Sequence, residues 1–262
     1  MALSIGHKPR SRADYLAREE PLEIRVRGRS VAVTMRTPGN DHELAAGFLL
    51  TEGIIRRRAD ITGIAKCLAA GSPENTLNVF LAPTVNVNFK QLTRHVFASS
   101  SCGLCGKASI EAVHQSFPPV EKTLTISPEA LASMPGRMRS AQRTFAQTGG
   151  LHAAALFDRS GKLLVLREDV GRHNAVDKVL GQAFLKGKIP LDSHLLFVSG
   201  RASFEIMQKA LAARIQIVAA ISAPSSLAVE FAKESNQTLI GFLRGKTMNV
   251  YCAAERVTGA LR

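Results

Sequence analysis

The second half of the chain alternates short apolar segments with amphipathic ones, and this alternation constrains the fold most. HLLFVSG (194–200) and IQIVAAIS (215–222) are almost wholly apolar, and each precedes a segment with helical periodicity. Strands without alternation are buried on both faces. The pattern therefore predicts a largely parallel sheet covered by helices on both sides, closed by two strands, TLIGFL and MNVYC, around an RGKT turn.

The segments before this alternation extend the same pattern. LHAAALF (151–157) and LLVLRED (163–169) are predicted strands, joined by a turn at 158–161. NAVDKVLGQAFLKG (174–187) is predicted to be a helix capped by Asn174. Its apolar residues fall on one face: Val176, Val179, Leu180, Ala183 and Phe184.

The first half is richer in strand signals. LEIRVRGRSVAVTM (22–35) alternates apolar and polar residues about Gly28 and predicts a β-hairpin. Its apolar face would contain Leu22, Ile24, Val26, Val31, Val33 and Met35. Asn40 and Glu43 have capping-box spacing for a helix that ends near Gly53. NTLNVFL (75–81) and NVNF (86–89) are predicted as two further strands.

A proline-rich passage separates these two halves. PPVEKTLTISPEALASMPGRM follows residue 117 and contains a helix start at Ser127-Pro128-Glu129. We place a domain boundary near residue 120. The sequence thus predicts an α/β protein, α+β overall. A small β-rich domain (1–120) would precede a larger α/β domain (121–262).

The distribution of apolar residues indicates the cellular compartment. No apolar run in the 262 residues reaches the ~18 needed to span a membrane, and the first 20 residues lack the apolar core of a secretory signal. We therefore expect a cytoplasmic protein without a membrane partner. In that reducing compartment the four cysteines are expected to be thiols.

The formal net charge of +13 favours an anionic partner. The basic residues are scattered, however, and aromatic residues make up only 5% of the chain. Few platforms exist for stacking bases, so the charge predicts a focused anion pocket rather than a nucleic-acid groove. We expect no nucleic-acid partner.

Three glycine- and serine-rich turns should meet at one edge of the predicted sheet. Ligands of open α/β sheets bind beyond the carboxyl ends of the strands, where helix N termini favour phosphate. The turns are EDVGRHN (168–174), SGRAS (199–203) and SAPSS (222–226). The candidate binding residues are Arg172, His173, Ser199, Gly200, Arg201 and Ser222. His173 is preferred to His152 because it lies within one of these turns.

SSCGLCGK (100–107) contains two further candidate reactive residues, Cys102 and Cys105. Half a zinc site, a redox dithiol, a sulfur-carrying nucleophile and two ordinary turn residues are the competing interpretations. A structural zinc needs four ligands, and the chain offers one CxxC without a second knuckle, so no stoichiometric zinc is expected. A carrier thiolate fits better, because Lys107 can lower a nearby thiol pKa.

These motifs together resemble the formate dehydrogenase accessory sulfurtransferase family (FdhD/NarQ). The resemblance extends from about residue 20 through RTPGNDHELAAGFLLTEGII, SSCGLCGKAS, TGGLHAAALF, REDVGRHNAVDKVLG, VSGRASFEIMQKA, SAPSSLAVEFA and TLIGFLRGKTMNVY. Seven blocks in order make a chance match untenable, whereas the CxxC alone would be weak.

The resemblance implies a homodimeric sulfurtransferase. Such proteins take persulfide sulfur from a cysteine desulfurase and pass it to the molybdenum (or tungsten) bis-guanine-dinucleotide cofactor of formate dehydrogenase, which is their bound substrate. The persulfide would form on Cys102, with Cys105 as partner. The cofactor-binding segment would be Phe242, Leu243, Arg244, Gly245, Lys246 and Thr247. The second domain would resemble cytidine deaminase without its zinc.

Two alternatives stay open at the level of sequence. A chaperone could hold the cofactor for the apo-dehydrogenase while the cysteines only shape their loop. A nucleic-acid binder is disfavoured by the scattered charge. Trapping a persulfide would distinguish the chaperone from a sulfur carrier. Titration with DNA or RNA would test for a nucleic-acid binder.

Overall fold

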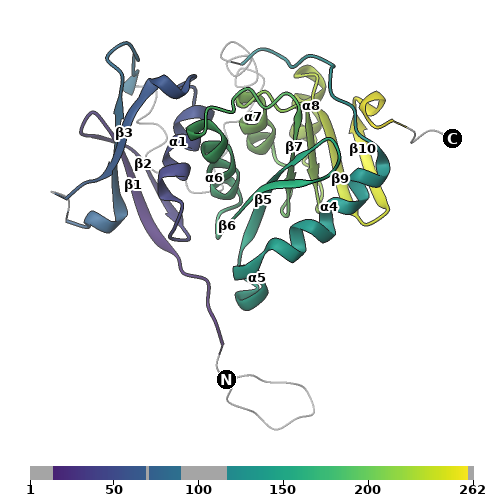
Figure 1. The fold of residues 1–262 in the computed structure, drawn as a ribbon, viewed down its shortest axis with the longest axis horizontal. Coiled ribbons are helices and arrows are strands. Elements are labelled where there is room, and N and C mark those ends of the chain that lie inside the picture. The colour runs from purple at the N-terminus through teal and green to yellow at the C-terminus, as the bar shows by residue number, and fades with distance from the viewer. Residues whose placement is uncertain (1–13, 69–70, 90–116, 259–262) are drawn as a thin grey trace, which may run out of the picture.

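A computed structural model describes residues 14–68, 71–89 and 117–258. Two β-sheets lie on either side of a helical layer (Figure 1). One sheet has four strands in the order β2-β1-β4-β3, and the other has six in the order β10-β9-β8-β7-β5-β6. The protein is therefore a mixed α/β protein, as predicted.

The predicted hairpin is present, with a different register in its second strand. β1 (Glu20–Val26) and β2 (Arg29–Arg36) pair antiparallel about a turn in which Gly28 has φ of 77°. A bulge between Ile24 and Arg25 shifts the pairing. Val33 and Met35 are consequently 40% and 48% exposed, and their prediction as core residues was wrong.

The rest of the first sheet departs from the sequence pattern. β4 (Thr76–Leu81) is the strand predicted from NTLNVFL, and it pairs parallel to β1. β3 (Ile61–Lys66) was not predicted, because its segment ITGIAK contains a glycine and alternates only weakly. The stretch 86–89 forms no strand. Short 3-10 turns precede β3 and β4, at Arg58–Asp60 (η1) and Pro73–Asn75 (η2) respectively.

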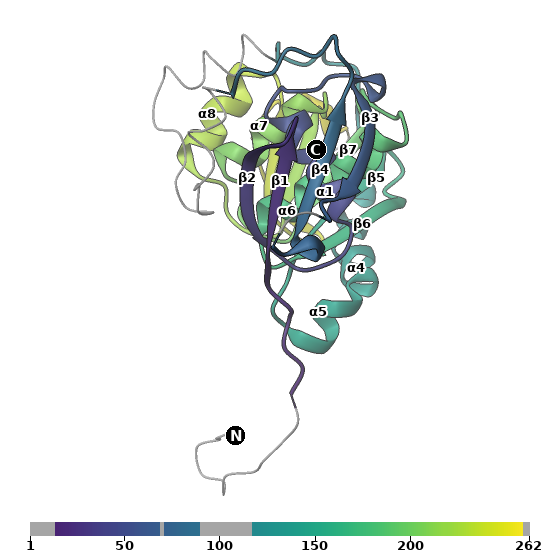
Figure 2. The same ribbon diagram turned by 90° about the vertical axis from the view of Figure 1, so that its left-hand side faces the viewer.

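Helix α1 (Asp41–Thr51) covers the inner face of this sheet. Figure 2 shows the sheet in front of α1 and α6. The predicted capping box is absent: Asn40 is left-handed, with φ of 58°, and its side chain makes no cap hydrogen bond. Glu43 accepts from the Arg167 guanidinium instead, with 2.7 Å between Oε1 and Nη2. A tertiary ion pair has replaced the local cap.

The second sheet is mixed rather than largely parallel. Only the β7–β8 and β8–β9 pairings are parallel; β5 pairs antiparallel with both β6 and β7, and β10 pairs antiparallel with β9. The strands are β5 (His152–Asp158), β6 (Leu163–Asp169), β7 (His194–Val198), β8 (Ile217–Ala220), β9 (Thr238–Arg244) and β10 (Thr247–Cys252).

Helices cover both faces of the second sheet, which makes this half three-layered. One face packs against α6 (Arg172–Leu185), α7 (Phe204–Ala212) and α8 (Ser226–Glu234). The other packs against α4 (Pro128–Ala141), whose predicted cap Ser127 accepts from the Ala130 amide. A short helix, α5 (Arg143–Thr148), follows α4, and a 3-10 turn, η4 (Ala254–Arg256), follows β10. The likeness to cytidine deaminase stays a prediction.

Asn174 does not cap α6. The helix begins at Arg172, and the Asn174 side chain is buried within the first turn. Its amide donates to the Met35 carbonyl at 2.7 Å and to Asp169 at 3.0 Å. The residue therefore ties β2 to the end of β6, which is a tertiary role that its local sequence does not reveal.

The two sheets are joined through a close helix crossing. A Cβ on Gly47 of α1 would lie 1.9 Å from the Asp177 carbonyl oxygen, and one on Gly181 of α6 would lie 1.8 Å from that of Glu43. Only glycine permits this approach of the two backbones. The boundary predicted near residue 120 stays a prediction. Within the described ranges, no helix is both long and apolar enough to cross a membrane.

Candidate functional site at one edge of the second sheet

Five strand ends meet at one edge of the second sheet. β7, β8 and β9 run parallel, so their carboxyl ends coincide there. β5 is antiparallel to β7, so its first residue, His152, lies at the same edge, as does Asp169 at the end of β6. The three predicted turns and the turn after β9 are thus brought together. Three helix N termini, those of α6, α7 and α8, follow from this edge.

Backbone contacts hold these turns to one another. The Ala202 amide donates to the Ala223 carbonyl at 3.2 Å, and the Ser225 amide donates to the Ala202 carbonyl at 3.0 Å. The Phe242 amide donates to the Ser222 carbonyl at 3.2 Å. Ser199 and Ser222 are partly exposed at this edge. The segments 199–203, 222–226 and 242–247 therefore form one continuous surface.

Arg172 lies where the first two turns meet. A Cβ on the buried Gly200 would lie 3.6 Å from the Arg172 Cδ and 3.3 Å from the His152 Nδ1. The Arg172 Nε is buried and has no hydrogen-bond partner. A buried guanidinium donor without an acceptor is costly. Arg172 is therefore placed to donate a hydrogen bond to an anionic ligand at this point.

The two histidines near this edge make different contacts. His173 is oriented toward α7, where its Nε2 lies 2.7 Å from the Glu205 carboxylate. That hydrogen bond is the main reason that the pKa of Glu205 is lowered. His152 is the one that lines the cavity described below. The pKa of His152 is lowered mainly by burial, with a further contribution from Arg172.

The basic side chains at the outer rim have no partner within the part of the chain that the structure describes. Arg201, Arg244 and Lys246 are exposed. The hydrogen bonds and ion pairs among the described residues include none from these three side chains. Their charges are consequently available to an anion from solution.

The turn after β9 has an unusual backbone. Phe242 is left-handed, with φ of 52°, and its ring is 38% exposed, while the neighbouring Leu243 is fully buried. A positive φ is strained for an aromatic residue and is retained where the surroundings require it. Gly245 also has a positive φ, 56°, at the tip of the turn. The turn thus presents an aromatic ring next to two cations.

An open cavity of about 610 Å³ adjoins this edge on the α4 side of the sheet. It is bordered by the α4–α5 junction, the start of β5 and the ends of β6 to β8. The lining residues are Arg139, Gln142, Phe145, Gly149, Gly150, Leu151, His152, Val170, Ser199 and Ile221. The sequence had indicated only Ser199 and, as the less favoured histidine, His152. Of the other lining residues, Gln142, Phe145, Gly149 and Gly150 belong to QRTFAQTGG, to which the sequence analysis gave no binding role.

A buried ion pair stabilises the turn that precedes Arg172 at this edge. Lys178 Nζ lies 2.6 Å from the Asp169 carboxylate, and the same carboxylate accepts from the Gly171 amide at 2.8 Å. Lys178 also donates to the Thr37 carbonyl. The pair therefore fixes the turn before Arg172 to the segment that precedes α1.

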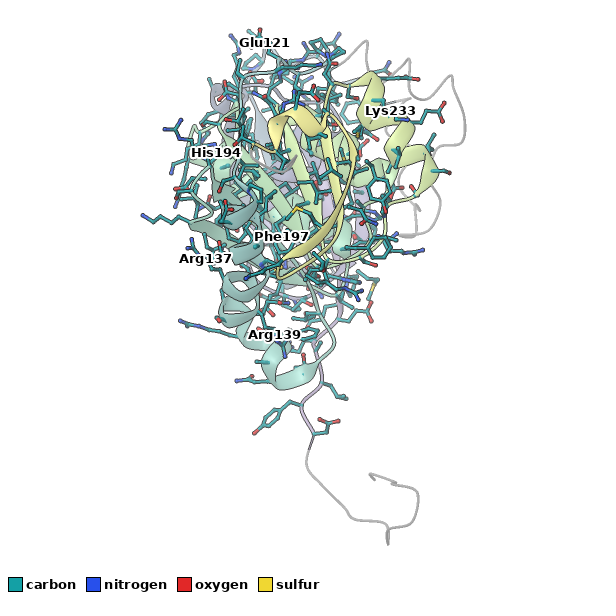
Figure 3. The ribbon with its side chains drawn as sticks, turned by 90° about the vertical axis from the view of Figure 1, so that its right-hand side faces the viewer. Glu121, Arg137, Arg139, His194, Phe197 and Lys233 are labelled. Carbon is teal, nitrogen blue, oxygen red and sulfur yellow. The ribbon has the colours of Figure 1, made fainter. Side chains whose placement is uncertain are left out.

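Cys102 and Cys105 lie outside the described residues, as does Lys107. The flanking residues Phe89 and Phe117 are described, and they lie at the other end of the molecule. The Arg29 guanidinium stacks over the Phe89 ring at the hairpin turn, and Thr123 binds Gln216, which precedes β8. Figure 3 shows the same separation, with Glu121 near one end and Arg139 near the other.

Metal-ligand clusters are absent from the described ranges. No group of three or more His, Cys, Asp or Glu side chains there is placed to hold a metal ion. Because the CxxC motif lies outside these ranges, the predicted absence of zinc stays a prediction.

Comparisons with known proteins agree with the resemblance in the motifs. A family model described as the FdhD/NarQ family matches residues 17–258. A protein of Mycobacterium tuberculosis named "Sulfur carrier protein FdhD" is 52% identical over 95% of this chain and 93% of its own length. A protein of the same name from Saccharolobus solfataricus is 42% identical over 94% of this chain and 91% of its own length.

A solved structure extends the likeness to three dimensions. It is a crystal structure of a protein from Desulfotalea psychrophila assigned as a formate dehydrogenase accessory protein. It is 27% identical, with a TM-score of 0.74 over 93% of this chain and 91% of that one. Sequence and fold agree over nearly the whole length, and the chain belongs to the FdhD/NarQ family.

Proposed function

We propose that this protein is a sulfur carrier that delivers persulfide sulfur to the molybdenum bis-guanine-dinucleotide cofactor of a formate dehydrogenase. The observation that carries the proposal is the sheet edge, whose cations have no partner among the described residues. The chain also contains SSCGLCGK and belongs to a family whose curated relatives are named sulfur carriers. The donor is a cysteine desulfurase.

Loading is a thiol–persulfide exchange. The Cys102 thiolate attacks the outer sulfur of the desulfurase persulfide. The S–S bond of the donor breaks, a new S–S bond forms on Cys102, and the desulfurase cysteine leaves as a thiolate. No net electrons are exchanged in this step, and only the ionised thiol is nucleophilic enough to perform it.

Delivery of sulfide requires two electrons, and Cys105 supplies them. Its thiolate attacks the inner sulfur of the Cys102 persulfide, which forms a Cys102–Cys105 disulfide and releases hydrosulfide to the metal of the bound substrate. A cellular dithiol then reduces the disulfide and restores both thiols. The step fits the CxxC spacing, which separates the two cysteines by only two residues of sequence.

The substrate would bind at the sheet edge. Its phosphates suit the N termini of α6, α7 and α8 and the guanidinium groups of Arg172, Arg201 and Arg244. The turn Phe242–Thr247 would hold it at the rim. Ser199, Gly200 and Ser222 border the same surface, with backbone groups close to the ligand. His173 would help to orient Arg172, its neighbour in α6.

The test is to separate sulfur loading from substrate binding. Cys102→Ala should retain its fold and its affinity for GDP, yet fail to activate formate dehydrogenase in cells lacking the native protein. Cys105→Ala should lose a substantial part of that activation. If Cys102→Ala activates the dehydrogenase fully, the protein acts as a cofactor-binding chaperone and the carrier mechanism is wrong.

A further inference from the structure

Three short basic segments lie at the end of the molecule opposite the candidate site. They are RGR (27–29) in the β1–β2 turn, RRR (56–58) after α1 and KGK (186–188) after the last residue of α6. Every residue in them other than glycine is a cation, and all seven cations are exposed. We call these seven side chains the basic end: Arg27, Arg29, Arg56, Arg57, Arg58, Lys186 and Lys188.

Hydrogen bonds connect the three segments into one surface. The Arg58 Nε donates to the Leu185 carbonyl at 3.2 Å, directly before KGK. The turn 82–85 connects RRR to RGR: its first amide donates to the Asp60 carbonyl at 2.9 Å, and its last carbonyl accepts from the Arg27 guanidinium at 2.7 Å. The basic end is therefore continuous, although its parts are far apart in the sequence.

The positive charge of this surface is not neutralised by the described residues. The side chains of Arg56, Lys186 and Lys188 form no hydrogen bond or ion pair with any other described residue. Within the described ranges, Arg57 alone among the seven is paired with a carboxylate, that of Asp60 at 3.6 Å. The other three contact backbone carbonyls or an aromatic ring, which leaves their charges available to an anionic partner.

The backbone that carries RRR is held in place from inside. Asp60 is only 7% exposed, and its carboxylate accepts from the amides of Arg56 at 2.8 Å and Arg57 at 2.9 Å. These bonds fix the loop while its guanidinium groups face solvent. A preorganised loop loses little conformational freedom when a partner binds, which favours recognition.

An aromatic side chain lies at the border of the basic end. Phe80 of β4 is 50% exposed. It follows Val79, which pairs in parallel register with Val26, the residue before Arg27. Arginine and aromatic residues are both enriched at protein interfaces, where an aromatic ring supplies buried apolar area and arginine supplies charged hydrogen bonds. This combination favours a protein as the partner.

Both described flanks of the segment that contains SSCGLCGK lie at this surface. The Phe89 ring lies under the Arg29 guanidinium, 5.0 Å from its centroid. Phe117 lies beside Gly53, shortly before RRR, where an added Cβ would be 3.4 Å from its ring. In Figure 1 the chain after residue 117 runs along the top of the molecule, whereas α5, next to the candidate site, is at the bottom. The charge of the basic end is thus separate from the proposed substrate site.

We propose that the basic end docks an acidic surface of the protein that loads sulfur onto Cys102. Opposite charges on two proteins increase the rate of productive encounter and set the orientation of the complex. The identity of this partner as the sulfur donor rests on the proposed function. Its acidic character rests on the charges of the described residues.

Binding kinetics of the intact protein with purified cysteine desulfurase, measured by surface plasmon resonance, would test the docking. Arg56→Glu/Lys188→Glu should lower the association rate constant at least about tenfold at low salt, and the difference should shrink as salt is added. Arg18→Glu/Arg143→Glu is the matched control, because it reverses two exposed arginines near the starts of β1 and α5, at the opposite end. The control should bind as wild type does.

Two further variants extend the test. Phe80→Ser should mainly raise the dissociation rate constant, since it removes the apolar contact and no charge. Arg27→Glu/Lys186→Glu should repeat the slow association and replaces the first variant if that protein does not fold. The proposal is overturned if the reversals associate with the desulfurase as fast as the control does. It is also overturned if they lose binding only to a DNA duplex or to phosphatidylserine vesicles.

Sulfur loading distinguishes failure of the docking surface from failure of the proposed function. The rate at which sulfur appears on Cys102 would be followed by mass spectrometry. Arg56→Glu/Lys188→Glu should load slowly from limiting desulfurase with cysteine, yet at the wild-type rate from a small-molecule persulfide, which needs no docking. Equal loading of variant and wild type by the desulfurase would contradict only the docking surface. No sulfur on wild-type Cys102 from either donor would contradict the carrier role, and the binding kinetics would still decide the docking surface.

Discussion

Lys178 and Asp169 form an ion pair at the centre of the molecule, 2.6 Å apart, with neither side chain accessible to more than 1%. The Asp169 carboxylate also accepts from the amides of Thr37, at 3.2 Å, and Gly171, at 2.8 Å. One carboxylate thus connects the start of α6 to the segment before α1. The pair links the architecture of the two sheets to the geometry of the candidate site.

Removal of Lys178 should be strongly destabilising. Lys178→Met would leave the Asp169 carboxylate buried without its counter-charge, at a cost of about 3 kcal/mol in the free energy of unfolding. Urea denaturation monitored by circular dichroism measures it. Lys122→Met, which breaks an exposed pair with Glu255, should cost far less. Equal losses in the two variants would contradict the structural role of the buried pair.

The helix crossing predicts a second contrast in stability. Gly181→Ala would place a methyl group 1.8 Å from the Glu43 carbonyl oxygen, so α1 and α6 must separate and unfolding should become easier by more than about 2 kcal/mol. Gly136→Ala lies in α4 with nothing within 4 Å, and should be neutral or stabilising by up to about 1 kcal/mol. Thermal melts of both variants test the crossing; a stable Gly181→Ala would refute it.

These features show which parts of the fold the sequence could predict. Strands and helices of the second half were found because each has its own periodicity. The bulge in the β1–β2 pairing was not, because register depends on pairing across strands. Asn40 and Asn174 were both taken for caps, since a local pattern does not reveal that Arg167 of β6 pairs with Glu43 or that Asn174 binds Asp169 of β6.

The candidate site likewise has a part that the sequence predicted and a part that it did not. Its sheet edge was predicted because strand order brings glycine- and serine-rich turns together whatever their separation along the chain. Gln142 and Phe145 were missed, because their chemistry arises only when the α4–α5 junction packs beside the start of β5. His152 was undervalued for a related reason: burial, which favours its neutral form, is not visible in TGGLHAA.

The exposed arginines of the sheet edge should contribute to nucleotide binding through charge. Arg201→Ala or Arg244→Ala should weaken GDP binding by roughly 1.5–3 kcal/mol at low salt. The difference should shrink as salt is added, because exposed charges are screened. Arg159→Ala, equally exposed at the opposite turn between β5 and β6, should have no effect in the same calorimetric titration. An unchanged affinity in both site variants would mean that the anion site lies elsewhere.

His152 should make stability depend on pH. Its folded-state pKa is lowered, so below about pH 6.5 the unfolded chain binds a proton that the folded chain does not. Stability should therefore fall as pH decreases from about 6.5 toward the folded-state pKa. His152→Asn should reduce this dependence, while the similarly lowered His194 remains in both proteins. Urea midpoints between pH 5 and 8 measure the slope, and identical slopes would contradict the burial argument.

The central claim, that sulfur travels on Cys102, is tested most directly by mass spectrometry of the protein after incubation with cysteine desulfurase and cysteine. We expect an adduct of one sulfur atom on the peptide containing Cys102, lost on treatment with a dithiol reductant and absent from Cys102→Ala. Cys67→Ala and Cys252→Ala, which alter free cysteines elsewhere in the chain, should carry the adduct as wild type does. An unmodified Cys102 in a protein that nonetheless activates formate dehydrogenase would contradict the account.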